Sequence, residues 1–264
     1  MVVQYAYDEV TDAAGGLRDL AGTFHLVARG AGFDHAFGVA VHGLPAEVSG
    51  LVRVQRFDTA LVMTDDASRP LADFITADDH GQTIARFDHL FPSTRRALPP
   101  LPGASFTNTS TAAPQVSPAS VRIVVTFDQP IPRAPLGGSP YDPYLLVAHG
   151  TERYDIHLPG RHGFPDRPMH LPPESSGLTY VDARQYPWAM VVPFDWRFPL
   201  ERVHINDGNA HTAAYPDFKA WRQSGGAQQA DWYKRPNLTA STPRVADSLA
   251  SGVRTRPWTL TAGH

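Results

Sequence analysis

The residues best suited to chemistry are the histidines and aspartates between residues 149 and 170 of this 264-residue chain. This stretch contains His149, His157, His162 and His170, with Asp155 and Asp166 between them. An imidazole beside carboxylates can act as a general acid or base in hydrolysis. His157 and Asp155 are therefore the candidate catalytic residues if the protein is a carbohydrate-active or other hydrolytic enzyme.

A structural role is the alternative for these residues, because the pattern around them matches no catalytic or metal-binding motif. Spacings of 8, 5 and 8 residues separate His149, His157, His162 and His170, and the prolines among them exclude the helix that carries common zinc motifs. The chain also lacks the Gly-x-Ser-x-Gly elbow of serine hydrolases and the Lys-Ser/Thr pair of a phosphate-binding loop. Loop histidines with local hydrogen bonds are the other interpretation.

Aromatic residues in the last third of the chain are candidates for contact with a ligand. A surface row of flat rings can stack on the faces of sugars. The candidates are Trp188, Trp196, Trp232 and Tyr233. The structural alternative is that these rings pack beneath a helix and belong to the core.

Alternation of apolar and polar residues predicts the β-strands that must position these groups. The clearest strand covers 121–127, where Val121, Ile123, Val125 and Phe127 share one face. Further strands are expected at 24–29, 37–41, 51–57, 60–64, 144–148, 153–158 and 188–192, and one helix is expected between 216 and 225.

The composition favours strands and turns over helices. Aspartate supplies 21 of the 26 acidic residues, and the chain has 25 prolines. Aspartate favours turns and caps, and proline removes a backbone donor from helices and central strands. We expect an all-β fold, a jelly-roll-like sandwich of two sheets with one late helix and long proline-rich loops.

The composition also excludes several classes of protein. The formal net charge of −3 argues against a nucleic-acid partner, and the absence of cysteine excludes disulfides and thiolate metal sites. No stretch approaches the ~18 apolar residues of a membrane span. The first residues contain no export signal.

Short segments distributed over roughly residues 1–236 resemble those of a known family. They include Met1-Val2-Val3, Ala28-Arg29-Gly30-Ala31, Phe37-Gly38, Phe106-Thr107-Asn108-Thr109, Tyr141-Asp142-Pro143-Tyr144, His157-Leu158-Pro159-Gly160, Tyr186-Pro187-Trp188-Ala189, Phe198-Pro199-Leu200-Glu201, Ala214-Tyr215-Pro216 and Asp231-Trp232-Tyr233. In their order and spread these segments resemble the LruC-domain family of secreted bacterial surface proteins. The resemblance implies an extracellular or cell-surface location.

The resemblance also implies a domain organisation. One sandwich domain covers 1–236, with 92–120 as a long loop inside it, and 237–264 is expected to be a loosely held tail. The family has an aspartate-rich run before its Met-Val-Val strand, and this chain begins after that position. Carboxylate oxygens suit calcium, so Asp142 and Asp8 are the candidate ligands if calcium stabilises the domain.

These observations favour a non-catalytic extracellular or cell-surface module. It would serve in adhesion or bind a surface glycan or another protein, with calcium as the candidate stabilising ion. The alternative function is the hydrolytic enzyme described above, with His157 and nearby carboxylates in its active site.

Overall fold

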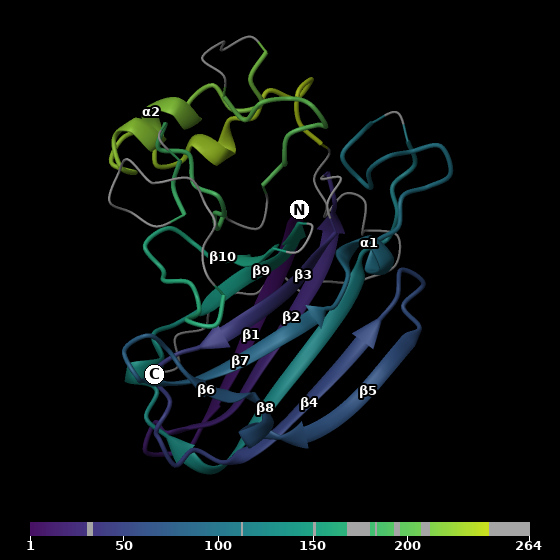
Figure 1. Cartoon of the computed structure of the whole chain (residues 1–264). Helices are drawn as coiled ribbons and strands as arrows, with labels where there is room; N and C mark the ends of the chain where they lie inside the picture. The colour runs from purple at the N-terminus through teal and green to yellow at the C-terminus, as the bar shows by residue number, and fades with distance from the viewer. Residues whose placement is uncertain are drawn as a thin grey trace.

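The structure is a computed structural model that describes residues 1–30, 34–111, 113–149, 152–167, 180–182, 184–192, 196–206 and 212–242. In these residues two antiparallel β-sheets stack face to face, and a mostly irregular segment lies over one end of the stack (Figure 1). The all-β sandwich predicted from the sequence is therefore confirmed.

Each sheet of the described structure contains five strands. The first sheet has the order β1-β2-β8-β4-β5, with bounds Val2–Thr11, Leu17–Ala28, Ala119–Ile131, Gly50–Phe57 and Met63–Pro70. The second sheet has the order β10-β9-β3-β7-β6, with bounds Glu152–Ile156, Asp142–His149, His35–Val41, Thr83–Phe91 and Ile75–Ala77. Short helical turns are α1 (Thr94–Ala97), η1 (Leu71–Phe74) and η2 (Ala134–Leu136).

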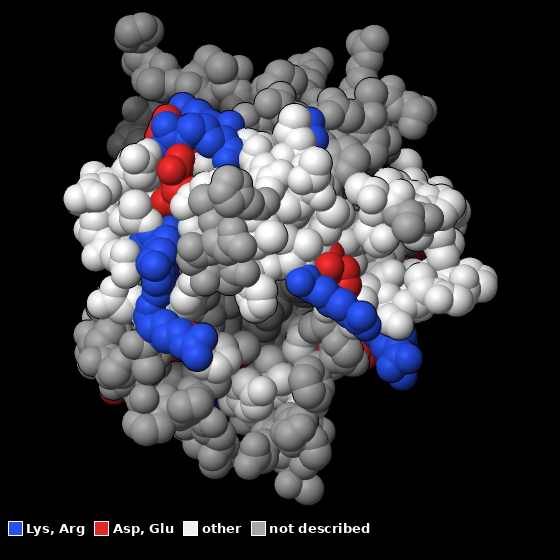
Figure 2. Space-filling view, turned by 90° about the horizontal axis from the view of Figure 1, so that it is seen from above, with Lys and Arg blue, Asp and Glu red and all other residues white. Residues whose placement is uncertain are grey.

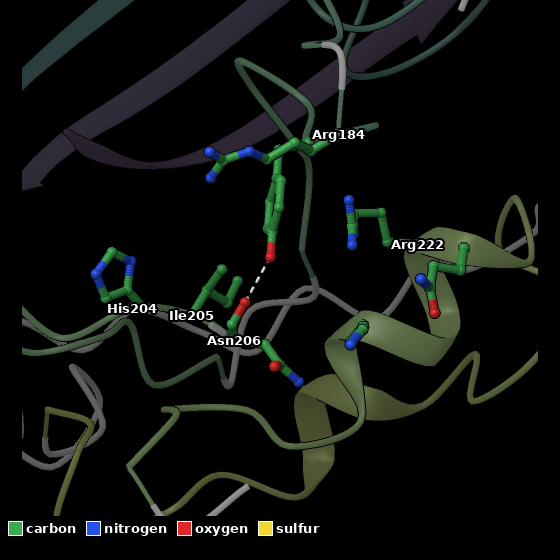
Figure 3. Close-up of a pocket in the computed structure, with 8 residues that line it drawn as sticks. Arg184, His204, Ile205, Asn206 and Arg222 are labelled. Carbon is green, nitrogen blue, oxygen red and sulfur yellow. Dashed lines mark hydrogen bonds between the residues drawn. The ribbon is translucent and has the colours of Figure 1, made fainter. Parts of the chain in front are cut away.

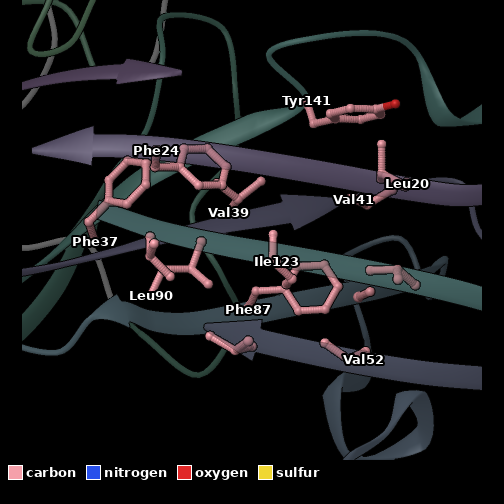
Figure 4. Packing of buried hydrophobic residues seen from close by; sticks show 14 of the residues in the cluster. Leu20, Phe24, Phe37, Val39, Val41, Val52, Phe87, Leu90, Ile123 and Tyr141 are labelled. Atoms are coloured by element: carbon pink, nitrogen blue, oxygen red, sulfur yellow. The ribbon is translucent and has the colours of Figure 1, made fainter. Parts of the chain in front are cut away.

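The core lies between the two sheets, where alternate side chains of each strand meet those of the facing sheet. The predicted strand at 121–127 is the middle of β8, and Val121, Ile123, Val125 and Phe127 are all at most 5% exposed. They pack with buried residues of the other sheet such as Phe87 (Figure 4). The alternation in the sequence therefore identifies the buried face of this strand.

The loop between β7 and β8 crosses from one sheet to the other and is fixed to the sandwich at Asn108. The Asn108 side chain donates to the carbonyls of Val27 and Val116, both at 2.7 Å, and accepts the Val116 amide at 2.8 Å. Its φ of 60° lies in the left-handed region, which asparagine tolerates better than most residues. This proline-rich stretch is therefore joined to β2 by specific hydrogen bonds.

The described residues from 180 to 242 form the segment that lies over the end of the sandwich, and we call them the cap. The cap contains α2 (Phe218–Gln223) and η3 (Trp232–Lys234), and otherwise consists of turns and loops (Figure 1). Phe198 of the cap packs on Val27 and Ala28 at the end of β2. The Glu201 amide donates to the carbonyl of Thr109 in the β7–β8 loop, so the cap is also hydrogen-bonded to this loop.

The structure corrects two sequence-based expectations about the cap. The predicted strand at 188–192 is irregular, because the prolines around it remove ladder donors. A loosely held tail was expected from residue 237 onward, but residues 240–242 are packed in the cap. Ala240, Ser241 and Thr242 are buried, and the Thr242 amide donates to the Phe198 carbonyl. The rest of that expected tail, 243–264, lies outside the described residues.

None of the described helices has the length and the apolar character that crossing a bilayer requires.

Candidate functional site

The predicted catalytic histidine and both nearby aspartates meet inside the molecule. Asp142 is the first residue of β9, Asp155 lies in β10, and His157 directly follows β10. The two strands pair as an antiparallel hairpin in which Ile156 lies opposite Leu145. This register brings His157 back beside the start of β9, next to Asp142.

His157 lies between the two carboxylates. Its Nδ1 is 3.0 Å from both carboxylate oxygens of Asp142, and its Nε2 is 3.3 Å from Oδ2 of Asp155. The side chains of all three residues are at most 1% exposed. Asp155 also accepts the Phe164 amide and the Tyr180 hydroxyl. We call Asp142, His157 and Asp155 the buried triad.

Each member of the buried triad favours the charged form of its neighbours. Burial by itself lowers the pKa of His157, but Asp142 and Asp155 outweigh it and raise that pKa above its ordinary value. Burial likewise raises the pKa of Asp142 and Asp155, yet their hydrogen bonds with His157 bring both values below the ordinary range. The two carboxylates therefore keep His157 protonated to a higher pH than an ordinary histidine.

Aromatic rings enclose the buried triad. Tyr144 stacks on the His157 ring at 5.1 Å, and Phe164 and Tyr180 lie 4.9 and 5.4 Å away. At Gly163 a Cβ atom would lie 2.7 Å from the Tyr180 hydroxyl and 2.9 Å from Oδ1 of Asp155, so only glycine fits there. No face of the His157 ring is open to a substrate in this arrangement. The geometry is that of a brace joining the β9–β10 hairpin to Phe164 and to Tyr180 of the cap.

The triad connects to the surface at one point. His42 follows β3, and its Nε2 lies 3.0 Å from Oδ2 of Asp142 while its side chain is 28% exposed. His42 Nδ1 in turn faces Asp78 at 3.9 Å. Asp142 is therefore shared between a buried and a partly exposed imidazole.

The raised pKa of His157 predicts how stability changes with pH. Its contribution is complete below about pH 6.5 and is lost as the pH rises through the raised value. Asp142 and Asp155 have the opposite sign, because their contribution is present above about pH 3.8 and is lost as the pH falls through their lowered values. We expect the triad to stabilise the fold most between these limits.

Urea unfolding of the wild type and of the His157→Gln variant measures this contribution. Burial lowers the pKa of His25 and His35, so their contribution to the stability of the fold decreases as the pH falls. Both proteins contain these two histidines, and the difference in unfolding free energy between the proteins therefore isolates His157. We expect that difference to shrink from about pH 6 to about pH 9. A difference that grows with pH over this range would contradict the protonated triad.

The two predicted calcium ligands do not come together in a metal site. Asp142 is fully buried and bonded to imidazoles, whereas Asp8 lies on the exposed side of the edge strand β1. Among the described residues no group of three His, Asp or Glu side chains is arranged to hold a metal ion. Calcium also takes backbone carbonyl and amide oxygens as ligands, and calcium binding by this chain stays a prediction.

The four predicted ligand-binding aromatics occupy different environments in the cap. Trp232 is 3% exposed and packs against Tyr215 and Phe218, with ring centroids 5.0 and 4.8 Å away. Trp196 is half-buried beside it, and Tyr233 lies at its edge. Trp188 is 41% exposed and is the one candidate whose ring faces solvent extensively. Most of this set forms the cap's core, so its rings do not make a continuous binding platform.

A pocket in the cap is lined by candidate functional residues that were not predicted from the sequence. It has a volume of about 630 Å³, within the usual range for small-ligand sites. Arg184 extends from one loop, Arg222 from α2, and a third segment supplies further lining residues (Figure 3). The lining consists of Arg184, Tyr186, His204, Ile205, Asn206, Lys219, Arg222 and Gln223. We call it the cap pocket.

The cap pocket is basic. Three cations line it and none of its described lining residues is acidic. Viewed from above, the cap surface also shows more Lys and Arg than Asp and Glu, with several basic side chains aligned along one side (Figure 2). Part of this signal was present in the sequence, because Lys219 and Arg222 are three residues apart on the predicted helix and so share one face. The approach of Arg184 from a distant loop was not predictable.

The fold and the cap pocket together define the class of this protein, an all-β sandwich with a pocket-bearing cap. A family model described as a domain of unknown function (DUF4842) matches residues 15–233, and the chain belongs to that family. The LruC resemblance remains a prediction beside this match. No curated protein matches the chain significantly.

A solved structure shares the fold. The crystal structure of a "Putative lipoprotein from Bacteroides ovatus" superposes with a TM-score of 0.59 and 14% sequence identity. The match covers 92% of this chain and 68% of the other. At this identity the similarity establishes the common architecture and nothing about the ligand.

Proposed function

We propose that the protein is a non-catalytic module of the cell surface or extracellular space that binds a glycan or another surface molecule through its cap. The cap pocket is the observation that carries this proposal, because it is a sizeable hollow lined by polar side chains. The name of the structural neighbour as a lipoprotein and the LruC resemblance support the location. Adhesion is the role that such binding would serve.

The hydrolytic alternative receives less support from the geometry. Its residues, His157 and Asp155, are fully buried and form an ion pair. His157 is hydrogen-bonded to Asp142, and Asp155 to Phe164 and Tyr180. A general acid or base must come within hydrogen-bond reach of the substrate. The enclosed triad offers no such approach, whereas the cap pocket is open but lacks a carboxylate for glycoside hydrolysis.

A glycan array probed with the full chain tests the proposed function. We expect binding to a restricted set of glycans, and we expect each bound glycan to be recovered intact after prolonged incubation. Cleavage of a bound glycan would overturn the non-catalytic part. Equal, weak signals across all glycans would overturn glycan binding by this module.

A further inference from the structure

The guanidinium of Arg222 is held in place with no acidic partner among the described residues. Its Cζ lies 4.0 Å from the centre of the Tyr186 ring, a cation–π distance. Phe218 also stacks with the Tyr186 ring, with centroids 6.0 Å apart and an interplanar angle of 28°. The Tyr186 hydroxyl donates to the Asn206 carbonyl. The ring that supports Arg222 is therefore fixed on several sides.

No carboxylate among the described residues neutralises the cations of the cap pocket. Asp182, the nearest acid in the sequence to Arg184, accepts the backbone amides of Arg184 and Tyr186, both at 2.8 Å. Asp217, which precedes α2, pairs with Arg235 at 2.7 Å. Both carboxylates are thus engaged elsewhere.

Three cations therefore face the cap pocket with unused donors in the described structure. Arg184 and Lys219 form no ion pair there, and the Arg222 Nε is buried without a hydrogen-bond acceptor. A guanidinium presents a planar fork that matches the two oxygens of a carboxylate or sulfate.

The remaining lining fits a ligand that also carries hydroxyl groups. The His204 imidazole and the Gln223 amide line the pocket and form no side-chain hydrogen bond within the described residues. Each can both donate to and accept from a hydroxyl. Ile205 adds one apolar contact. Charged donors, uncharged hydroxyl partners and a small apolar surface together match an acidic sugar.

We propose that the cap pocket binds an acidic sugar residue of a glycan, with its carboxylate or sulfate on Arg222 and supporting charge from Arg184 and Lys219. This inference rests on the proposed function and specifies its ligand class. Two kinds of sugar carry an oxyanion on a polyhydroxylated ring. They are uronic acids, which carry a carboxylate, and sulfated sugars.

Titration calorimetry of the full chain distinguishes these sources. The probes are digalacturonate with its uncharged dimethyl ester, and galactose 6-sulfate with galactose. We expect the charged member of at least one pair to bind at least about tenfold more tightly than its neutral partner, because charge-assisted hydrogen bonds are the strong ones. We also expect the affinity to fall as salt is added.

Variants locate the binding site. Arg222→Gln is expected to weaken binding of the charged sugar at least about tenfold, and Arg222→Lys less, because lysine keeps the charge but loses the fork. Lys219→Gln, at an exposed position, should weaken binding several-fold without affecting the fold. Arg96→Gln removes an exposed arginine of α1 outside the pocket and is the matched control, expected within about twofold of the wild type.

The outcomes separate this inference from the proposed function. Neutral sugars that bind as tightly as charged ones, with no effect of Arg222→Gln and Lys219→Gln, would overturn the acidic-sugar assignment and leave glycan binding intact. Tighter binding of an acidic peptide, such as hexaglutamate, than of either acidic sugar would overturn the sugar assignment. Failure of every sugar to bind would overturn the acidic-sugar assignment and the glycan-binding part of the proposed function.

Discussion

Replacing His157 by glutamine is expected to reduce the free energy of unfolding by about 3–5 kcal/mol. The substitution removes the positive charge that lies between Asp142 and Asp155, whose side chains are at most 1% exposed. Two carboxylates then remain buried without their shared partner, and such unpaired charges are costly. Urea unfolding followed by fluorescence, near pH 6, measures the loss.

His162→Gln is the matched control for this substitution. The His162 side chain is 65% exposed and lies 4.0 Å from Asp79, so its loss should change stability by less than about 0.5 kcal/mol. The double variant His157→Gln/Asp142→Asn should lose less than the sum of its single variants, because removal of one carboxylate relieves part of the unpaired charge. Wild-type stability of His157→Gln would show that the triad is not a brace.

Replacing Trp232 by alanine is expected to cost about 3–5 kcal/mol and to disorder the packing of the cap. Trp232 is 3% exposed and contacts five other aromatic rings, those of Trp196, Tyr215, Phe218, Trp221 and Tyr233. Alanine leaves a cavity that these rings cannot easily fill. Unfolding by urea and the near-ultraviolet circular dichroism of the folded state should both report the loss.

Trp188→Ala provides the comparison within the same segment. Its side chain is 41% exposed, so we expect a change below about 1 kcal/mol and an almost unaltered near-ultraviolet spectrum. Equal stability of the two variants would contradict the assignment of Trp232 to the core. The pair therefore separates a packing role from the ligand-contact role predicted from the sequence.

The sequence predicted the strands of the sandwich because their alternation is a local property. The expected strands at 121–127, 144–148 and 153–158 correspond to β8, β9 and β10. The expected helix between 216 and 225 corresponds to α2. Strand β7 was not predicted, because its sequence does not alternate strictly. Its adjacent residues Leu90 and Phe91 are both buried, at the irregularity in its pairing with β3 near Phe37.

The site could be predicted only where residues are close in the sequence. Antiparallel pairing of the two strands expected at 144–148 and 153–158 places His157 near Asp142, so the buried triad had a detectable signal. The burial of the triad depends on Phe164 and Tyr180, which close over it from separate loops. Such loop contacts follow no sequence period, so the burial of His157 could not be predicted from the sequence.

The cap pocket was not predictable for the same reason. Its residues come from three separate segments, and two of these are irregular loops. The basic character of the pocket is also hidden by the net charge of −3 for the whole chain. A global charge near neutrality is therefore compatible with a local anion site.

Hydrogen–deuterium exchange of the full chain, with and without saturating digalacturonate or galactose 6-sulfate, tests the central claim most directly. Bound ligand should slow amide exchange in the three segments of the cap pocket, at 184–186, 204–206 and 219–223. Strands of the sandwich distant from the cap should exchange as before. Protection confined to the sandwich, or to the surroundings of His157, would contradict the assignment of binding to the cap.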